Sequence, residues 1–100
     1  MTEIQGIGGH REEIDRIDEQ IVELLNSRRK QVLAIGAIKH TGHEPVLDFQ
    51  RESDVIHHVH SANIGPLPDD EIAAFYELIL EYSARAQRAH AEYLKHNERQ

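Results

Sequence analysis

The sequence predicts an all-α chain of three helices, of which the first is very long. Apolar residues recur at helical spacing in three segments, and the prolines fall only in the two connections between them. No segment has the alternating pattern of a convincing strand. A first helix of about 30 residues would be about 45 Å long, longer than a compact chain of this size is wide. We therefore expect it to project and to bury its apolar face against another chain.

The first helix is expected to run over residues 11–40, without an internal proline. Gly36 is the only weak helix former inside it, and an isolated glycine is tolerated. Gly42 suits the C′ position after the helix, and Pro45 prevents its continuation. Residues 1–9, with three glycines and few anchoring side chains, are expected to form a mobile tail. The apolar residues of the helix keep a helical period: Ile14, Ile17, Ile21, Leu24, Leu25, Val32, Ile35 and Ile38.

A second, shorter helix is expected after Pro45. Asp48 can cap its first turn, because a carboxylate accepts the free N–H groups there. Its apolar side is Val55, Ile56 and Val59, and it ends near Ala62. The proline- and glycine-containing segment 63–68 then predicts a turn.

The third helix is expected to begin at Asp69 and to end near Leu94. Three acidic residues in its first turn favour it, because they oppose the positive end of the helix dipole. Residues 96–100 are expected to fray, which leaves one domain over residues 10–95. The apolar face of this helix is formed by Ile72, Phe75, Tyr76, Ile79 and Tyr82.

Composition excludes several classes of function. The chain has 18 acidic against 11 basic residues and a formal net charge of -7, which disfavours non-specific binding to nucleic acid. It has no cysteine, and so no disulfide, thiolate nucleophile or cysteine-ligated zinc. No apolar run approaches the roughly 20 residues of a membrane span, and the N-terminus does not resemble a signal peptide. We expect a cytoplasmic protein.

Two basic residues, Arg28 and Lys39, are expected on the same face of the first helix. The heptad series of apolar positions reaches Arg28, whereas its neighbour Arg29 points toward solvent. Lys39 follows Arg28 by 11 residues, about three helical turns, so the two share a face about 16 Å apart. Arg28 needs an anion there, either an internal carboxylate or a ligand. Arg11 is about 25 Å from Arg28 on the same helix, so it can serve a shared ligand only from another protomer.

Other polar residues leave two interpretations open. Asp48 and Arg51 can form a local surface pair worth about 0.2–0.5 kcal/mol, or they can contribute to a site. Ser83 and Gln87 lie on the apolar stripe of the third helix. They can bond to each other, to the backbone or to water, or they can bind a ligand.

Taken together, these residues resemble the all-α chorismate mutases of the AroQ class. The resemblance covers about residues 10–90, and its strength lies in the order and spacing of the whole set. The matching segments are Arg11-Glu-Glu-Ile-Asp-Arg-Ile-Asp18, Leu24-Leu25-Asn-Ser-Arg28-Arg29, Ile35-Gly36-Ala-Ile-Lys39, Pro45-Val46-Leu-Asp48, Arg51-Glu52 and Ser83-Ala-Arg-Ala-Gln87.

The resemblance implies an intertwined homodimer of three-helix chains that converts chorismate to prephenate at two sites, without a cofactor or metal. It implies that Arg28 binds one substrate carboxylate and that Arg11 of the other chain binds the second. Some members of the family are fused to, or bind, other shikimate-pathway enzymes. The resemblance also implies the remaining roles: Lys39 and Gln87 donate to the ether oxygen, Lys39 and Ser83 contact a carboxylate, Glu52 and the Asp48 backbone hold the ring hydroxyl, and Arg51 orders the wall of the site.

Three alternatives stay open. Isochorismate pyruvate lyases resemble the same sequence, although the adjacent Arg51 and Glu52 favour the mutase branch. A non-catalytic, dimeric regulatory module would have the same helices, but Arg28 and Gln87 on its apolar seams would weaken it without a ligand to bind. The eight histidines suggest a metal site, yet the repeated Glu-x-x-His motifs of a di-metal bundle are missing, which favours solvated surface histidines.

Overall fold

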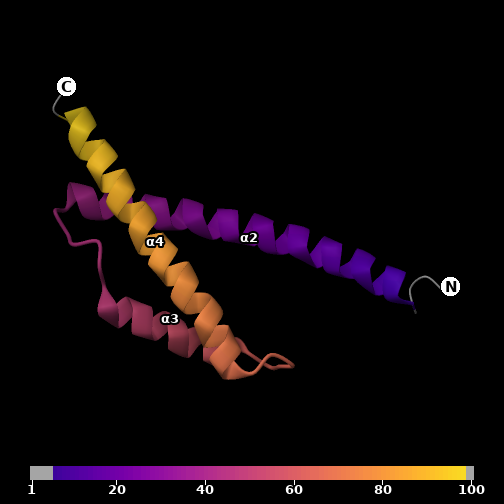
Figure 1. Ribbon diagram of the computed structural model, residues 1–100. Coiled ribbons are helices and arrows are strands. Elements are labelled where there is room, and N and C mark those ends of the chain that lie inside the picture. Colours follow the sequence, from indigo (N-terminus) through magenta and orange to yellow (C-terminus); the bar gives the residue numbers. More distant parts are fainter. Residues whose placement is uncertain (1–5, 99–100) are drawn as a thin grey trace. The chain divides into compact units, whose positions relative to one another are not determined.

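The computed structural model describes residues 6–98, which form three helices joined by two short connections (Figure 1). The helices are α2 (Ile7–Thr41), α3 (Phe49–Ala62) and α4 (Asp69–Glu98). Since residues 6–98 contain no strand, the all-α prediction is confirmed. None of the described helices is both long enough and apolar enough to cross a membrane. By its internal contacts the chain divides into two units, Met1–Gln31 and Val32–Gln100.

Helix α2 begins earlier than predicted. It is already helical at Ile7, and the N–H of His10 donates to the Gly6 carbonyl at 3.2 Å. Residues 7–9 of the expected tail are therefore helical, and residues 1–5 lie outside the described part of the chain. Once a helix is nucleated, each added residue contributes a hydrogen bond, which here offsets the poor helix propensity of the two glycines.

The apolar side chains of α2 in the first unit remain uncovered. Five of the predicted core residues in this part of the helix are between 44% and 68% exposed: Ile14, Ile17, Ile21, Leu24 and Leu25. They keep the heptad-like spacing that predicts a buried seam. Among the described residues, this part of the helix therefore presents a largely uncovered apolar face.

The end of α2 differs from the prediction at one residue. The N–H of His43 donates to the His40 carbonyl at 3.2 Å, and the N–H of Glu44 donates to the Lys39 carbonyl at 2.7 Å. This pair of bonds is the Schellman motif, in which the residue at C′ has a left-handed conformation. His43 is that residue, with φ 56°. The prediction that Gly42 occupies C′ is wrong, because the helix continues through Thr41.

The Schellman motif predicts opposite results for two neighbouring substitutions. His43→Gly is expected to raise the free energy of unfolding by about 1 kcal/mol, because glycine adopts a positive φ without a steric penalty. Gly42→Ala is expected to be tolerated, since an added Cβ would meet only ordinary contacts at 3.6–3.7 Å. Urea denaturation of both variants measures the difference. Destabilisation by Gly42→Ala with no gain from His43→Gly would contradict the assignment of C′.

Helix α3 begins as the sequence predicts. Asp48 has an extended backbone, and its side chain accepts a hydrogen bond from the Arg51 N–H at 3.0 Å. The helix ends at Ala62, and the side chain of Asn63 organises the following turn. Its amide donates to the Leu67 carbonyl at 2.9 Å and to Asp69 at 2.8 Å. These bonds fix the connection between α3 and α4.

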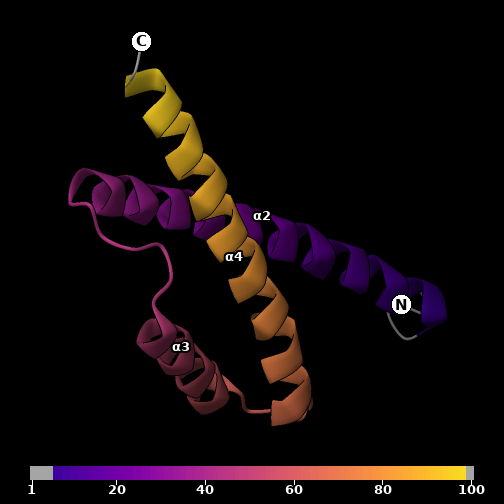
Figure 2. The ribbon, with the colours of Figure 1, turned by 60° about the vertical axis from the view of Figure 1, so that its left-hand side comes forward.

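Helix α3 packs against α4, as Figures 1 and 2 show. Val55 of α3 is the only large hydrophobic side chain that is buried among the described residues, at 6% exposure, whereas Phe75 and Tyr82 of the predicted α4 face stay about half exposed. Helix α4 extends to Glu98, so the prediction that it ends near Leu94 is wrong. The carboxylate of Glu98 lies 2.7 Å from Nε2 of His40. This contact supports the last turn of α4, and the residues near Glu98 in sequence do not predict it.

Candidate functional site

The second unit contains two buried polar residues, Ser83 and Gln87 of α4, both about 9% exposed. They lie one turn apart, as predicted, and both bond to backbone carbonyls. The Ser83 hydroxyl donates to Ile79 at 2.7 Å, and Nε2 of Gln87 donates to Val32 of α2 at 2.8 Å. Bonding to the backbone is one of the two interpretations left open by the sequence. It uses one of the two N–H groups of Gln87, so the amide retains a second donor.

Lys39 lies one turn beyond Gly36 on α2, and Gly36 is the residue against which Gln87 packs. The ammonium group of Lys39 donates to the Val46 carbonyl at 3.1 Å and is partly buried. This bond holds the lysine toward the connection between α2 and α3. An ammonium group has three donors, so Lys39 keeps two for another acceptor.

The first turn of α3 provides the next candidate residues. The Asp48 carboxylate accepts from the backbone N–H of Arg51, and its backbone carbonyl accepts from the N–H of Glu52 at 3.0 Å. Asp48 therefore caps the helix, and within the described residues it forms no ion pair with the Arg51 side chain, which was one of the two interpretations left open. Arg51 is exposed and Glu52 is partly buried.

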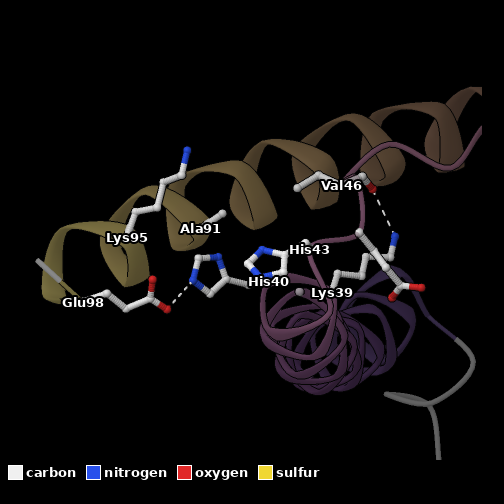
Figure 3. A pocket seen from close by; sticks show the side chains of 9 residues that line it. Lys39, His40, His43, Val46, Ala91, Lys95 and Glu98 are labelled. Carbon is white, nitrogen blue, oxygen red and sulfur yellow. Dashed lines mark hydrogen bonds and ion pairs between the residues drawn. The ribbon is translucent and has the colours of Figure 1, made fainter.

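A cavity of about 330 Å³ adjoins this region within the second unit. Figure 3 shows Lys39 and His40 reaching it from α2, and Lys95 and Glu98 from α4. Two interactions border it, the Lys39–Val46 hydrogen bond and the His40–Glu98 contact. The full lining is Gly36, Lys39, His40, His43, Glu44, Val46, Ala91, Lys95 and Glu98. The lining combines basic and acidic side chains with the apolar Val46 and Ala91.

The first unit contains the other two predicted cations. Arg28 is partly buried, whereas its neighbour Arg29 is exposed, as the heptad series predicts. Arg11 is exposed near the start of α2. Their relation to the residues of the second unit stays a prediction.

Sequence reasoning missed three features of the second unit. The first is Gly36, whose backbone faces Gln87. An isolated glycine inside a long predicted helix could have indicated such a close contact. The second is the pairing of His40 with Glu98, which depends on how α2 and α4 pack. The third is His60 of α3, whose Nε2 is buried without a hydrogen-bond partner among the described residues.

The donor groups of Lys39 and Gln87 are chemically suited to binding an anion. Within residues 6–98, no three histidine or acidic side chains gather where they could hold a metal ion. Lys39 lines the cavity and Gln87 packs against Gly36 of its lining; donors of this kind stabilise negative charge that develops on an oxygen. The amide keeps its donor at every pH, since it does not titrate.

Comparison with known proteins finds a matching family model and several relatives. The family model described as chorismate mutase type II matches residues 10–88. The chain is 39% identical, over 71 residues, to a bifunctional chorismate mutase/prephenate dehydratase of Neisseria gonorrhoeae. It is 32% identical, over 90 residues, to the protein of the same name from Escherichia coli K12. The alignments cover 71% and 89% of this chain but only 19% and 23% of those proteins, so the chain spans about a fifth of their length.

A solved structure has the same fold. The chain superposes on a chorismate mutase (form II) from Thermus thermophilus with a TM-score of 0.80 and 29% sequence identity. The superposition covers 82% of this chain and 93% of that one. The form I structure of that protein gives a TM-score of 0.75, with 77% of this chain and 96% of the other covered.

Proposed function

The chain belongs to the chorismate mutase type II family, whose domain it carries over residues 10–88, and we propose that it converts chorismate to prephenate. In this rearrangement a C–O ether bond breaks and a C–C bond forms within one molecule. The reaction needs no nucleophile. It needs a flexible dianion held in its reactive conformation and donors at the ether oxygen, where negative charge grows.

The observation that carries the proposal is the buried amide of Gln87. Burying a polar side chain on an apolar helix face is unfavourable unless its hydrogen bonds are satisfied. One N–H of Gln87 is used by the Val32 carbonyl, and the ether oxygen would take the other. Lys39, one turn beyond Gly36, would donate to the same oxygen and to a substrate carboxylate.

The two carboxylates of chorismate would be bound by two arginines. A guanidinium group is always charged and matches a carboxylate with two parallel hydrogen bonds. Arg28 would bind one carboxylate from its own chain, and Arg11 of a second chain would bind the other. The remaining contacts would come from Glu52 and the Asp48 backbone at the ring hydroxyl, from Ser83 at a carboxylate, and from Arg51 at the wall of the site.

This assignment requires a homodimer, and the apolar face of α2 supports one. Large aliphatic side chains there are about half or more exposed on a helix of 35 residues. Each Å² of apolar surface removed from water contributes about 25 cal/mol. A second copy of the chain offers the same face, as in an isologous dimer. Antiparallel pairing of the two α2 helices would carry Arg11 of one chain toward Arg28 of the other.

The test is to follow the decay of chorismate absorbance with purified protein. We expect decay far above the uncatalysed rate and formation of prephenate. Isochorismate in a parallel assay, with pyruvate as the readout, separates the mutase from the lyase alternative. Decay of chorismate at the uncatalysed rate would count against the proposed activity.

A further inference from the structure

The side chain of Gln87 lies directly on the backbone of α2. A Cβ atom built on Gly36 would lie 3.2 Å from Cγ of Gln87 and 3.7 Å from its Cβ and Cδ. The first distance is shorter than ordinary van der Waals contact, so a Cβ at residue 36 would push the aliphatic part of Gln87 away by a few tenths of an ångström. Gly36 is itself buried.

The same glycine exposes the acceptor that Gln87 uses. The Val32 carbonyl lies one helical turn before Gly36 and accepts its N–H in the regular α-helical pattern. A carbonyl oxygen has two lone pairs, so it can accept a second hydrogen bond where a side chain can approach. Nε2 of Gln87 makes this second bond at 2.8 Å.

This bond decides which end of the amide faces the helix. If the amide were turned by 180°, its oxygen would face the oxygen of Val32, and neither atom has a hydrogen to donate. The orientation observed keeps Nε2 at the helix and leaves its second N–H available. The proposed reaction needs a donor at this residue.

We propose that Gly36 is a positioning residue for the reaction: it admits Gln87 to the Val32 carbonyl and thereby fixes the amide with an N–H directed to substrate. This inference rests on the proposed function. It also accounts for a glycine in the interior of a long helix, where every residue except proline is more favourable.

Gly36→Ala is the direct test, and Gly8→Ala is the matched control. Gly8 lies in the same helix, and nothing lies within 4 Å of a Cβ built there. Both variants should keep or raise the unfolding temperature, because alanine is the better helix former. For Gly36→Ala we expect kcat to fall about tenfold or more with a smaller change in KM, since small misplacements of a catalytic group are costly. For Gly8→Ala we expect both constants to stay at wild-type values.

A second measurement tests the hydrogen bond of the Gln87 amide independently of activity. In the NMR spectrum of the wild-type chain, one of the two Gln87 side-chain amide protons should be protected from exchange, and Gly36→Ala should remove this protection while Gly8→Ala keeps it.

Unchanged kcat in Gly36→Ala, or unchanged protection, would overturn the role of Gly36 while leaving the mutase activity standing. Loss of helical circular dichroism in Gly36→Ala would overturn it too, since Gly36 would then be needed for folding. A wild-type chain that is inactive toward chorismate would instead overturn the proposed function, and the proton exchange would still decide the orientation of the amide.

Discussion

Replacing Gln87 with leucine is expected to lower kcat/KM for chorismate by about 10²- to 10³-fold, the usual cost of removing one donor from a developing oxyanion. Leucine has a similar volume and needs no hydrogen bond, so the fold should persist. The Val32 carbonyl keeps its helical hydrogen bond. Steady-state kinetics with circular dichroism as a check on folding measure the effect.

Gln87→Glu tests the same donor role of residue 87 through the pH dependence of activity. A carboxylate accepts hydrogen bonds and cannot donate, whereas the protonated acid donates one. Burial disfavours the charged form and raises the pKa of the introduced carboxyl. Activity of this variant should therefore be low at about pH 8 and should rise as the pH falls. Wild-type protein and Gln87→Leu are the controls, because neither has a titrating group at this residue. Full wild-type activity of Gln87→Glu in alkaline buffer would show that residue 87 does not donate to the ether oxygen.

The second large effect is expected for the two arginines. Arg11→Ala and Arg28→Ala should each lower activity by about 10²-fold or more, because a bidentate pair includes two charge-assisted hydrogen bonds of about 1.5–3 kcal/mol each. Mixing the two inactive variants should restore activity. In a mixed dimer with shared sites, one site carries both lesions and the other carries neither.

The amount restored is also predicted. With free exchange of subunits, half of the dimers are mixed and each has one intact site of two, so activity should approach about one quarter of the wild-type value. Arg29→Ala is the matched control: its side chain is exposed beside Arg28, and we expect little effect. Persistent inactivity of a mixture whose subunits have demonstrably exchanged would rule out a site shared in this way.

The parts of the fold that depend on local chemistry could be predicted from the sequence. The cap at Asp48 and the stop after Thr41 follow from residue types within a few positions, and both helices adopt them. The start of α2 and the end of α4 differ from the prediction, because helix propagation decided the first and a partner distant in sequence decided the second. Ile7 extends a helix that is already nucleated, and Glu98 meets His40, 58 residues away in sequence.

In the candidate site, too, local residue types could be interpreted from the sequence, whereas contacts between helices could not. Residue type and period identified Gln87 and Ser83 as polar groups on an apolar face, and both are buried. The sequence could not predict that Gln87 bonds to the Val32 carbonyl, because such a bond depends on the approach of two helices rather than on spacing within one. The sequence predicted the cap at Asp48 but could not decide whether the same carboxylate also pairs with the Arg51 side chain.

Val55 is the single large hydrophobic side chain that is buried among residues 6–98, and this has a consequence for how the protein behaves in dilute solution. One such residue cannot balance the conformational entropy lost on folding. If the missing apolar contacts come from a second copy, folding and pairing form one equilibrium, and chain concentration enters the stability directly. Dilution would then unfold the protein as heating does, and its activity per chain would fall with it.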